Sequence, residues 1–233
     1  MDKIKYLSRI QLFTGLELEQ LRKLEPITPA NLWKKKTTIA SPYTPRNCLF
    51  LIKSGTVRLY RISSSGKELT VDLLGSGHIF GEIGSFTTGT ENVYAETIED
   101  STICTLDKDR FESIVMERPE LGLKFIEIIS LRLREVEEML ELIAYGSVRK
   151  RLLYLLYKLS RKFGRQLDAD PGWLQLDVRI THQELASMAG SIRETVTEQL
   201  RRMIIEGVIG KAGSRSPFRV HPERLLRALE EID

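Results

Sequence analysis

The fold is decided by residues 181–196, which read THQELASMAGSIRETV. Thr181 and Glu184 form a capping box, in which each side chain satisfies a backbone amide at the start of a helix. Gly190 suits the left-handed conformation that ends a helix in a tight turn, and Ser191 is placed to cap a second helix. The stretch therefore predicts two helices joined by a glycine turn, the helix-turn-helix arrangement found in many DNA-binding proteins.

The second predicted helix has two different faces, because helical spacing groups Val196, Leu200, Met203 and Ile204 into an inward apolar face. The outward side chains suit base reading, since Arg contacts guanine O6 and N7 while Glu accepts from cytosine N4. A β-wing is expected at residues 208–211 and 218–220, where Lys211, Arg215 and Arg219 are suited to phosphate contact. The candidate DNA-binding residues are Thr181, His182, Ser191, Arg193, Glu194, Thr195, Thr197, Glu198, Arg201, Lys211 and Arg215.

The distribution of charge supports contact with a polyanion. The chain of 233 residues has a formal net charge of +3. Residues 147–233 hold 16 Lys and Arg against 11 Asp and Glu, whereas residues 1–146 hold 19 against 21. A basic C-terminal third is typical of nucleic-acid binding. The charge distribution is needed as additional support, because two short helices with a glycine turn also occur in proteins that bind no DNA.

The N-terminal half combines short helices with β-structure. Short helical patterns cover residues 4–25 and end at Pro26 and Pro29. From Trp33 to Leu106 the sequence changes to short apolar or alternating runs separated by Gly, Pro, Ser and Asn, which predict an antiparallel sandwich or barrel. Residues 64–67 are expected to form a hairpin tip. The strand-like runs are residues 48–53, 56–62, 69–74, 93–98 and 102–106.

A long helix is predicted after Pro119, which suits the first helical position. It carries a heptad seam of Ile126, Ile129, Leu133, Val136, Leu140 and Ile143. A second apolar stripe contains Phe125, Ile128, Met139 and Leu142. One face can pack on the β-domain of the same chain and the other on a second copy, so the seam predicts a homodimer. The alternative is a single helix that lies in the groove of a monomer.

The chain breaks at Gly146 and Ser147, where Ser147 is placed to cap a helix over residues 148–163. A loop over residues 164–173 and a strand over residues 174–180 are expected to follow. We therefore expect three parts: a β-roll effector domain at 1–117, a dimerisation helix at 118–146, and a winged helix-turn-helix at 147–233.

Several segments together resemble the Crp–Fnr family, that of the bacterial catabolite activator protein and the fumarate–nitrate reduction regulator. The resemblance implies an α+β fold with a cyclic-nucleotide-binding-like β-roll (a double-stranded β-helix), a long dimerisation helix and a winged helix-turn-helix. It also implies binding to double-stranded DNA at a near-palindromic operator, and recruitment or blocking of RNA polymerase. The segments are FLIKSGTV at residues 50–57, GHIFGEIG at 77–84, the long helix, ITHQELA at 180–186 and GSIRETV at 190–196.

The resemblance places the candidate effector site between the β-roll and the long helix, but with departures from the cyclic-AMP-binding pattern. In relatives that bind cyclic AMP, an Arg-Ser-Ala triplet follows the Gly-Glu segment; counting on from Gly81 and Glu82, Asn92 stands in place of that Arg. The loss of a charge-assisted contact costs about 1–3 kcal/mol. The Thr-Ser pair of those relatives corresponds to Val136 and Glu137. We therefore expect an unidentified small-molecule effector other than cyclic AMP. The candidate effector-binding residues are Gly81, Glu82, Ile83, Asn92, Val93, Tyr94, Arg132, Val136 and Met139.

Arg132 is the one charged residue in the second helical stripe. It could bind an acidic effector, as relatives that use 2-oxoglutarate do, or pair with Glu82. The ion pair is favoured because charges on long helices usually find local partners. Activity without any effector also stays open.

Within the second helix, the resemblance assigns Arg193 and Glu194 to the G and C of a TGTGA-like half-site. Relatives carry a second Arg three positions beyond Thr195, where this chain has Glu198. A carboxylate does not read guanine. We therefore expect operators that keep the guanine read by Arg193 and diverge at the inner position.

Metal, haem and enzymatic chemistry find little support in the sequence. The two cysteines, Cys48 and Cys104, are expected to be free thiols, although a redox pair stays open. Iron–sulfur members of the family need four cysteines, and near the segment that ligates haem in other members only His78 is available. An enzyme on a cupin-like β-roll would need a metal cluster, but the three histidines fall in three different segments, and we expect no metal site. A ligand-binding module without a DNA role is the remaining alternative.

Membrane insertion is not expected. Charged residues interrupt the N-terminus, and no stretch approaches the ~20 apolar residues that span a bilayer. The sequence therefore predicts a cytoplasmic protein without a membrane partner.

Overall fold

The computed structural model describes residues 3–26, 28–44, 46–84, 86–167, 170–211 and 217–231. The chain forms two compact units, one made of Met1–Gly66 with Val71–Val136 and the other of Lys67–Thr70 with Glu137–Asp233. The first unit contains an antiparallel β-domain and the second a winged helix-turn-helix, so the predicted α+β fold class is confirmed.

Short helices precede the β-domain, as the pattern over residues 4–25 predicts. They are α1 (Lys3–Leu7), the 3-10 helix η1 (Gln11–Phe13) and α2 (Leu18–Leu24). Helix α2 ends two residues before Pro26, whose ring cannot continue a helix. Helix α3 (Lys108–Glu117) follows the last strand and begins at Asp107, whose side chain accepts a hydrogen bond from the Arg110 amide.

Among the described residues of the N-terminal half, nine strands form two antiparallel sheets. One sheet has the order β1-β9-β3-β6-β7 and the other β2-β8-β4-β5. All five predicted runs are strands, and the expected tip at residues 64–67 joins the neighbouring strands β4 and β5. The strands are β1 (Ala30–Trp33), β2 (Thr38–Ala40), β3 (Cys48–Ser54), β4 (Val57–Ile62), β5 (Glu68–Leu74), β6 (Ile79–Ile83), β7 (Phe86–Thr87), β8 (Tyr94–Thr97) and β9 (Ser101–Asp107). The alternation of residue types does not reveal β1 and β7, because their residues are mostly exposed.

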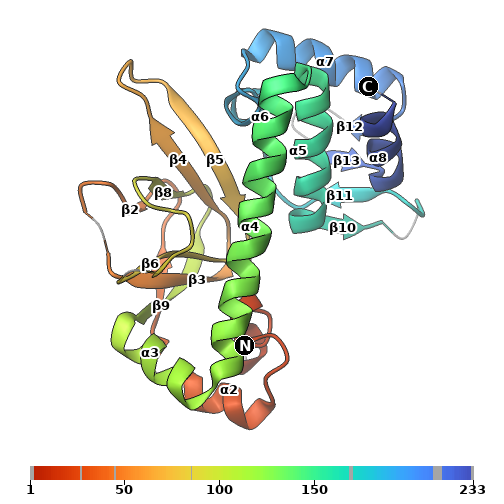
Figure 1. Ribbon diagram of the computed structural model, residues 1–233. Helices are drawn as coiled ribbons and strands as arrows, with labels where there is room; N and C mark the ends of the chain where they lie inside the picture. Colours follow the sequence, from red (N-terminus) through yellow and green to blue (C-terminus); the bar gives the residue numbers. More distant parts are fainter. Residues whose placement is uncertain are drawn as a thin grey trace. The chain divides into compact units, whose positions relative to one another are not determined.

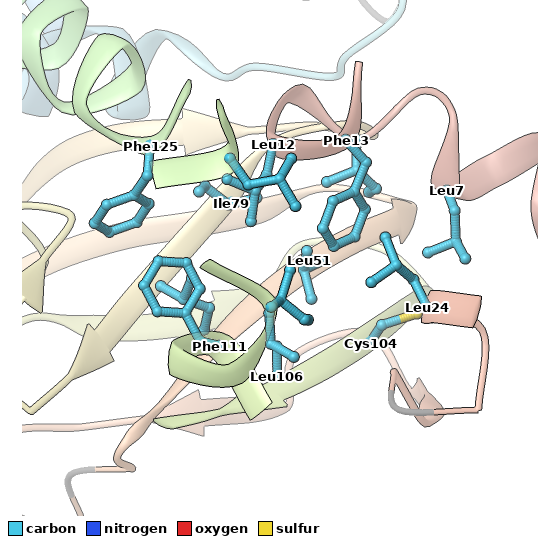
Figure 2. Packing of buried hydrophobic residues seen from close by; sticks show 14 of the residues in the cluster. Leu7, Leu12, Phe13, Leu24, Leu51, Ile79, Cys104, Leu106, Phe111 and Phe125 are labelled. Carbon is cyan, nitrogen blue, oxygen red and sulfur yellow. The ribbon is translucent and has the colours of Figure 1, made fainter. Parts of the chain in front are cut away.

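Strand β3 is buried on both faces, which explains its continuous apolar run. Leu49 and Leu51 point to a core shared with α1, α2, α3 and α4. Phe50 and Ile52 point to a second core, where Phe50 stacks on Phe80 with ring centroids 4.8 Å apart. Figure 2 shows the first of these cores, in which helical and strand side chains interdigitate.

The long helix α4 (Pro119–Tyr145) contains 27 residues and starts at the predicted proline. Figure 1 shows it as a single long helix, coloured green. In its first turns Leu121 and Phe125 are buried in the first core, and Ile128 and Ile129 pack against it. Phe125 contacts Phe111 at a ring-centroid distance of 5.1 Å. The predicted second stripe thus anchors the start of the helix to its own β-domain. The described helices include none that is long and apolar enough to cross a membrane.

The second unit packs three helices and a small sheet around α5 (Val148–Phe163), which begins at the predicted Ser147 cap. Its four strands have the order β10-β11-β13-β12. The prediction of a loop over residues 164–173 is wrong for its first three residues, because Gly164–Gln166 form a strand that pairs antiparallel with Leu174–Leu176. These three residues are exposed, so no alternation reveals the strand. The other elements are α6 (His182–Ala189), α7 (Arg193–Ile205), β10 (Gly164–Gln166), β11 (Leu174–Leu176), β12 (Ile209–Lys211), β13 (Phe218–Val220) and α8 (Pro222–Glu230); β11 is shorter than the strand expected over 174–180.

Candidate DNA-binding surface and effector pocket

The turn between α6 and α7 has the predicted geometry. The amide of Glu184 donates to Oγ1 of Thr181 at 3.1 Å, and the amide of Thr181 donates to Oε2 of Glu184 at 2.6 Å, which completes the capping box. Gly190 has φ 59° and ψ 45°. A Cβ at this position would meet no atom within 4 Å. Glycine is therefore favoured here by the left-handed backbone and not by close packing.

The expected cap at Ser191 is wrong. Helix α7 has Ile192 as its N-cap, with no side-chain hydrogen bond at that position. The amide of Ser191 instead donates to the Ala186 carbonyl at 2.9 Å. Ser191 thus satisfies a carbonyl at the end of α6 and does not cap α7, whose N-cap lies one residue later than the pattern predicts.

Helix α7 presents a polar face to solvent. Val196, Leu200 and Met203 are buried, as expected. Ile204 is 41% exposed, against expectation, because it lies about 80° around the helix from Val196 at about 100° per residue. Arg193, Glu194, Thr197, Glu198 and Arg201 are all exposed, whereas Thr195 is half-buried.

Local bonds hold some of these side chains and leave others available. The hydroxyl of Thr197 donates to the Arg193 carbonyl at 2.8 Å and lies 2.9 Å from Nδ1 of His182. Glu198 forms an ion pair with Arg202 one turn later. Within the described part of the chain, the guanidinium of Arg193 makes no hydrogen bond or ion pair, so its donors stay available to an external acceptor.

The predicted wing consists of β12 and β13, which pair antiparallel with Lys211 opposite Phe218. The side chain of Lys211 and the whole of Arg215 lie outside the described residues. Arg219, expected to contact phosphate, forms an ion pair with Asp170 and lies over the Trp173 ring at 5.6 Å. Its charge is therefore already partnered within the domain.

The apolar seam of α4 is uncovered in the single chain. Ile129 is half-buried and packs against the first core. The other five seam residues are 53–65% exposed, namely Ile126, Leu133, Val136, Leu140 and Ile143. A row of exposed large apolar side chains on a helix is typical of an interaction surface.

A pocket of about 250 Å³ lies in the β-domain. It brings together four of the candidate effector residues, Gly81, Glu82, Asn92 and Val93. Gly81 has φ +112°, and a Cβ there would lie 2.4 Å from the Cys48 carbonyl oxygen, so only glycine fits. Asn92 has φ 58°, a left-handed conformation that Asn adopts more readily than most residues.

Comparisons with known proteins agree with this architecture. Residues 31–118 match the cyclic nucleotide-binding domain, and residues 150–229 match the Crp-like helix-turn-helix domain. The chain is 33% identical over 161 residues to the "Cyclic AMP receptor protein" of Thermus thermophilus, which covers 69% of this chain and 70% of that protein. It is 30% identical over 171 residues to the "Global nitrogen regulator" of Synechococcus elongatus, covering 72% and 75%. A mutant of CooA from Carboxydothermus hydrogenoformans superimposes with a TM-score of 0.71 at 26% identity, covering 90% of this chain and 89% of that one.

The chain belongs to the Crp/Fnr family of transcription regulators. The relatives are transcription regulators and not enzymes. In this Crp/Fnr regulator, α6 and α7 lie within the part of the chain that matches the Crp-like helix-turn-helix domain.

The pocket of this Crp/Fnr regulator carries acidic charge. Glu82 and Glu91 both line it. Burial raises the pKa of the Glu82 carboxyl above its usual range, and the negative charge of Glu91 raises it further. Arg46 is the third charged residue of the lining, and its guanidinium lies over the Trp33 ring at 5.6 Å.

The remaining candidate effector residues lie outside the pocket lining. Ile83 is fully buried in the first core, and the Tyr94 ring stacks on Tyr60. Val136 is 57% exposed. Met139 is half-buried and belongs to the second compact unit.

Arg132 does not pair with Glu82, contrary to expectation. Its Nη2 lies 3.7 Å from Oδ2 of Asp72, and both side chains are largely buried. Asp72 comes from β5, so the ion pair ties this strand to α4 within the first unit. The favoured partner was wrong because sequence spacing gives no information on which strand faces the helix.

Sequence reasoning missed one wall of the pocket. Ala40 lines it from the end of β2, and Ser41, Pro42 and Arg46 line it from the connection between β2 and β3. Pro42 indicates only a turn, and nothing local predicts that this turn closes over β6 and the residues before β8. In the described residues no group of three or more His, Cys, Asp or Glu side chains could hold a metal ion. Cys48 and Cys104 are free, as predicted.

Proposed function

We propose that this Crp/Fnr regulator binds a near-palindromic DNA operator as a homodimer, under the control of a small-molecule effector other than cyclic AMP. Residues 1–117 would form the effector domain, 118–146 the dimerisation helix and 147–233 the DNA-binding domain. The observation that carries the proposal is the exposed polar face of α7, with an Arg193 guanidinium that has no partner among the described residues.

The first turns of α7 carry the base-reading chemistry. Arg193 can donate two hydrogen bonds to guanine O6 and N7, and Glu194 can accept from cytosine N4. Thr181, His182 and the wing residues Lys211 and Arg215 would contact the backbone, which fixes register without reading sequence.

Glu198 supports an operator that differs from TGTGA at the inner position. Its carboxylate is neutralised by Arg202 and offers acceptors only. We infer that the position facing Glu198 carries no fixed guanine. Selection of sites from random DNA tests this, and recovery of an unmodified TGTGA-N6-TCACA consensus would contradict it.

The exposed seam of α4 supports the homodimer. Pairing two copies of Ile126, Leu133, Val136, Leu140 and Ile143 would bury these side chains in a coiled coil. A two-fold dimer that reads successive major grooves needs its recognition helices about 34–36 Å apart. An effector that favours one arrangement of the long helices would set this spacing. Recruitment or blocking of RNA polymerase would follow from DNA occupancy.

Cyclic AMP is the rival effector, since the name of the Thermus thermophilus relative refers to it. Gly81 and Glu82 of the pocket also match the cyclic-AMP-binding pattern. Against it stand the neutral Asn92, in place of the arginine, and the Glu91 carboxylate, which would repel a cyclic phosphate. Isothermal titration calorimetry with cyclic AMP decides between them, and micromolar affinity would overturn the proposal.

The DNA-binding proposal is tested by mobility shift with genomic fragments at several salt concentrations. Specific binding should exceed non-specific binding by a factor of about 10³ or more. A linear fall of log affinity with log salt would report the phosphate contacts. Equal affinity for all fragments would leave only non-specific polyanion binding.

A further inference from the structure

The β-domain pocket has an excess of negative charge. Its charged lining consists of Glu82, Glu91 and Arg46. Among the residues that the structure describes, the carboxylates of Glu82 and Glu91 form no ion pair. The Arg46 guanidinium is engaged with the face of the Trp33 ring. Two carboxylates without an ion pair among the described residues therefore line one pocket.

The backbone of Gly81 in the pocket wall is not available to an anion. The amide of Gly81 donates to Oγ1 of Thr90 at 3.0 Å. The carbonyl of Gly81 accepts from the Thr88 hydroxyl at 3.0 Å. Thr88 and Thr90 are themselves buried, so this network is shielded from solvent. Phosphate and carboxylate sites normally use free backbone amides, and the amide beside Glu82 is already bound.

The pocket is small, and part of its remaining lining is apolar. Phe50, Phe80, Val93 and Ala95 contribute to its lining. Its volume of about 250 Å³ is below the ~300–1,000 Å³ typical of drug-sized ligands. A ligand with few heavy atoms and an apolar body fits this space better than a nucleotide does.

We propose that this pocket binds a compact organic cation, a protonated amine on a short apolar body, as the effector. The inference rests on the proposed function for the role of the ligand as effector, but the binding site itself is argued from the pocket alone. An ammonium group between Glu82 and Glu91 would donate charge-assisted hydrogen bonds to both carboxylates and relieve their repulsion. Its apolar body would cover the Phe50 and Phe80 side of the pocket.

The test is calorimetric titration of the full-length protein with probes of matched size and opposite charge. n-Butylamine carries the proposed cation, butyrate carries an anion on the same chain length, and cyclic AMP represents the nucleotide. Butylamine is expected to bind with millimolar affinity, as a ligand of few atoms does, and butyrate is expected not to bind. Tighter binding of butyrate or cyclic AMP, or no binding of butylamine at millimolar concentration, overturns the proposal.

Charge variants locate the site. The double variant Glu82→Gln with Glu91→Gln should weaken butylamine binding about tenfold or more, since each lost charge-assisted bond weakens binding by such a factor. Glu96→Gln is the matched control, because Glu96 lies in β8 outside the pocket lining and should leave binding unchanged. Equal effects of the two changes overturn the assignment.

Two further measurements keep the test decisive. If the double variant fails to fold, the pH dependence of butylamine binding to the wild type replaces it. This binding should weaken as the pH falls, because the carboxylates become protonated. Binding that does not change with pH would contradict the site. Mobility shift on the same protein separates the two proposals. DNA binding without amine binding refutes only the ligand class, whereas absence of DNA binding refutes the proposed function.

Discussion

In helix α7, Nε of Arg202 lies 2.9 Å from Oε1 of Glu198, one turn earlier in the chain. Both side chains are more than half exposed, so the ion pair contributes little to stability, on the order of 0.5 kcal/mol. Its consequence is functional. It holds an acceptor-only group on the face that we propose reads DNA.

Glu198→Arg is expected to change the selected operator. An arginine there can donate two bonds to guanine, so sites selected from random DNA should gain a fixed guanine at the inner position. The like charges of positions 198 and 202 should lower the free energy of unfolding by only about 0.5 kcal/mol. Glu198→Ala is the control, because it removes the ion pair with Arg202 without adding a side chain that can donate to guanine. Identical consensus sites for wild type, Glu198→Ala and Glu198→Arg would show that position 198 does not face the bases.

Arg193→Ala is expected to weaken specific DNA binding by about 10–100-fold, corresponding to about 1–3 kcal/mol. The melting temperature should not change, because the guanidinium is exposed and has no partner within the described residues. Fluorescence anisotropy at several salt concentrations measures the affinity and the salt slope.

Arg193→Lys separates base reading from charge. Lysine keeps the positive charge but lacks the planar fork, so the variant should retain most non-specific affinity and lose discrimination against the wrong base. A variant that discriminates as well as wild type would contradict bidentate reading by Arg193.

Gly190→Ala is expected to destabilise the protein by about 1 kcal/mol, because Gly190 has φ 59° and alanine pays for the left-handed conformation. No atom lies within 4 Å of the new Cβ, so the loss should come from the backbone alone. Gly190→Asn should lower the free energy of unfolding by less, since Asn tolerates the left-handed conformation. Urea denaturation measures both, and equal losses for Ala and Asn would indicate a steric cause instead.

The helix-turn-helix could be predicted from sequence because its determinants are local. The capping box of Thr181 and Glu184 and the turn at Gly190 lie within ten residues and act through the backbone. Even here the helix start was misplaced by one cap residue, from Ser191 to Ile192. The residue on which a helix begins or ends is set by backbone geometry, and the type of residue there only makes one position more favourable than another.

The pocket could be predicted only in part because its walls meet through tertiary structure. Gly81 and Asn92 were found through the family resemblance, whereas Arg46 comes from a connection with no local pattern. The partner of Arg132 was wrong for the same reason: Asp72 is 60 positions away in the chain, and only the fold of β5 against α4 brings it within 3.7 Å.

Leu133→Lys is expected to convert the proposed dimer into a monomer and to lower operator affinity. Leu133 lies on the seam and is 57% exposed in the single chain, so the change should leave each chain folded. Leu131→Lys is the matched control, because Leu131 is 51% exposed on the same helix but two positions from Leu133, and so on another face. Sedimentation velocity should show a monomer for the first and a dimer for the second. A dimer for both variants would place the interface elsewhere.

Glu82→Gln is expected to raise the melting temperature at neutral pH. Burial and the charge of Glu91 raise the pKa of Glu82 in the folded state, so the charged carboxylate disfavours folding. For a group whose pKa is raised on folding, stability is greatest below the unfolded value, near 4.5, and is lost as the pH rises through the folded value. The advantage of the glutamine variant should therefore be greatest above the raised pKa of the folded state and shrink as the pH falls toward 4.5. Thermal unfolding of wild type and variant across this range measures it. A variant that is less stable than wild type at neutral pH would mean that the Glu82 carboxylate is stabilised by a partner rather than left uncompensated in the pocket.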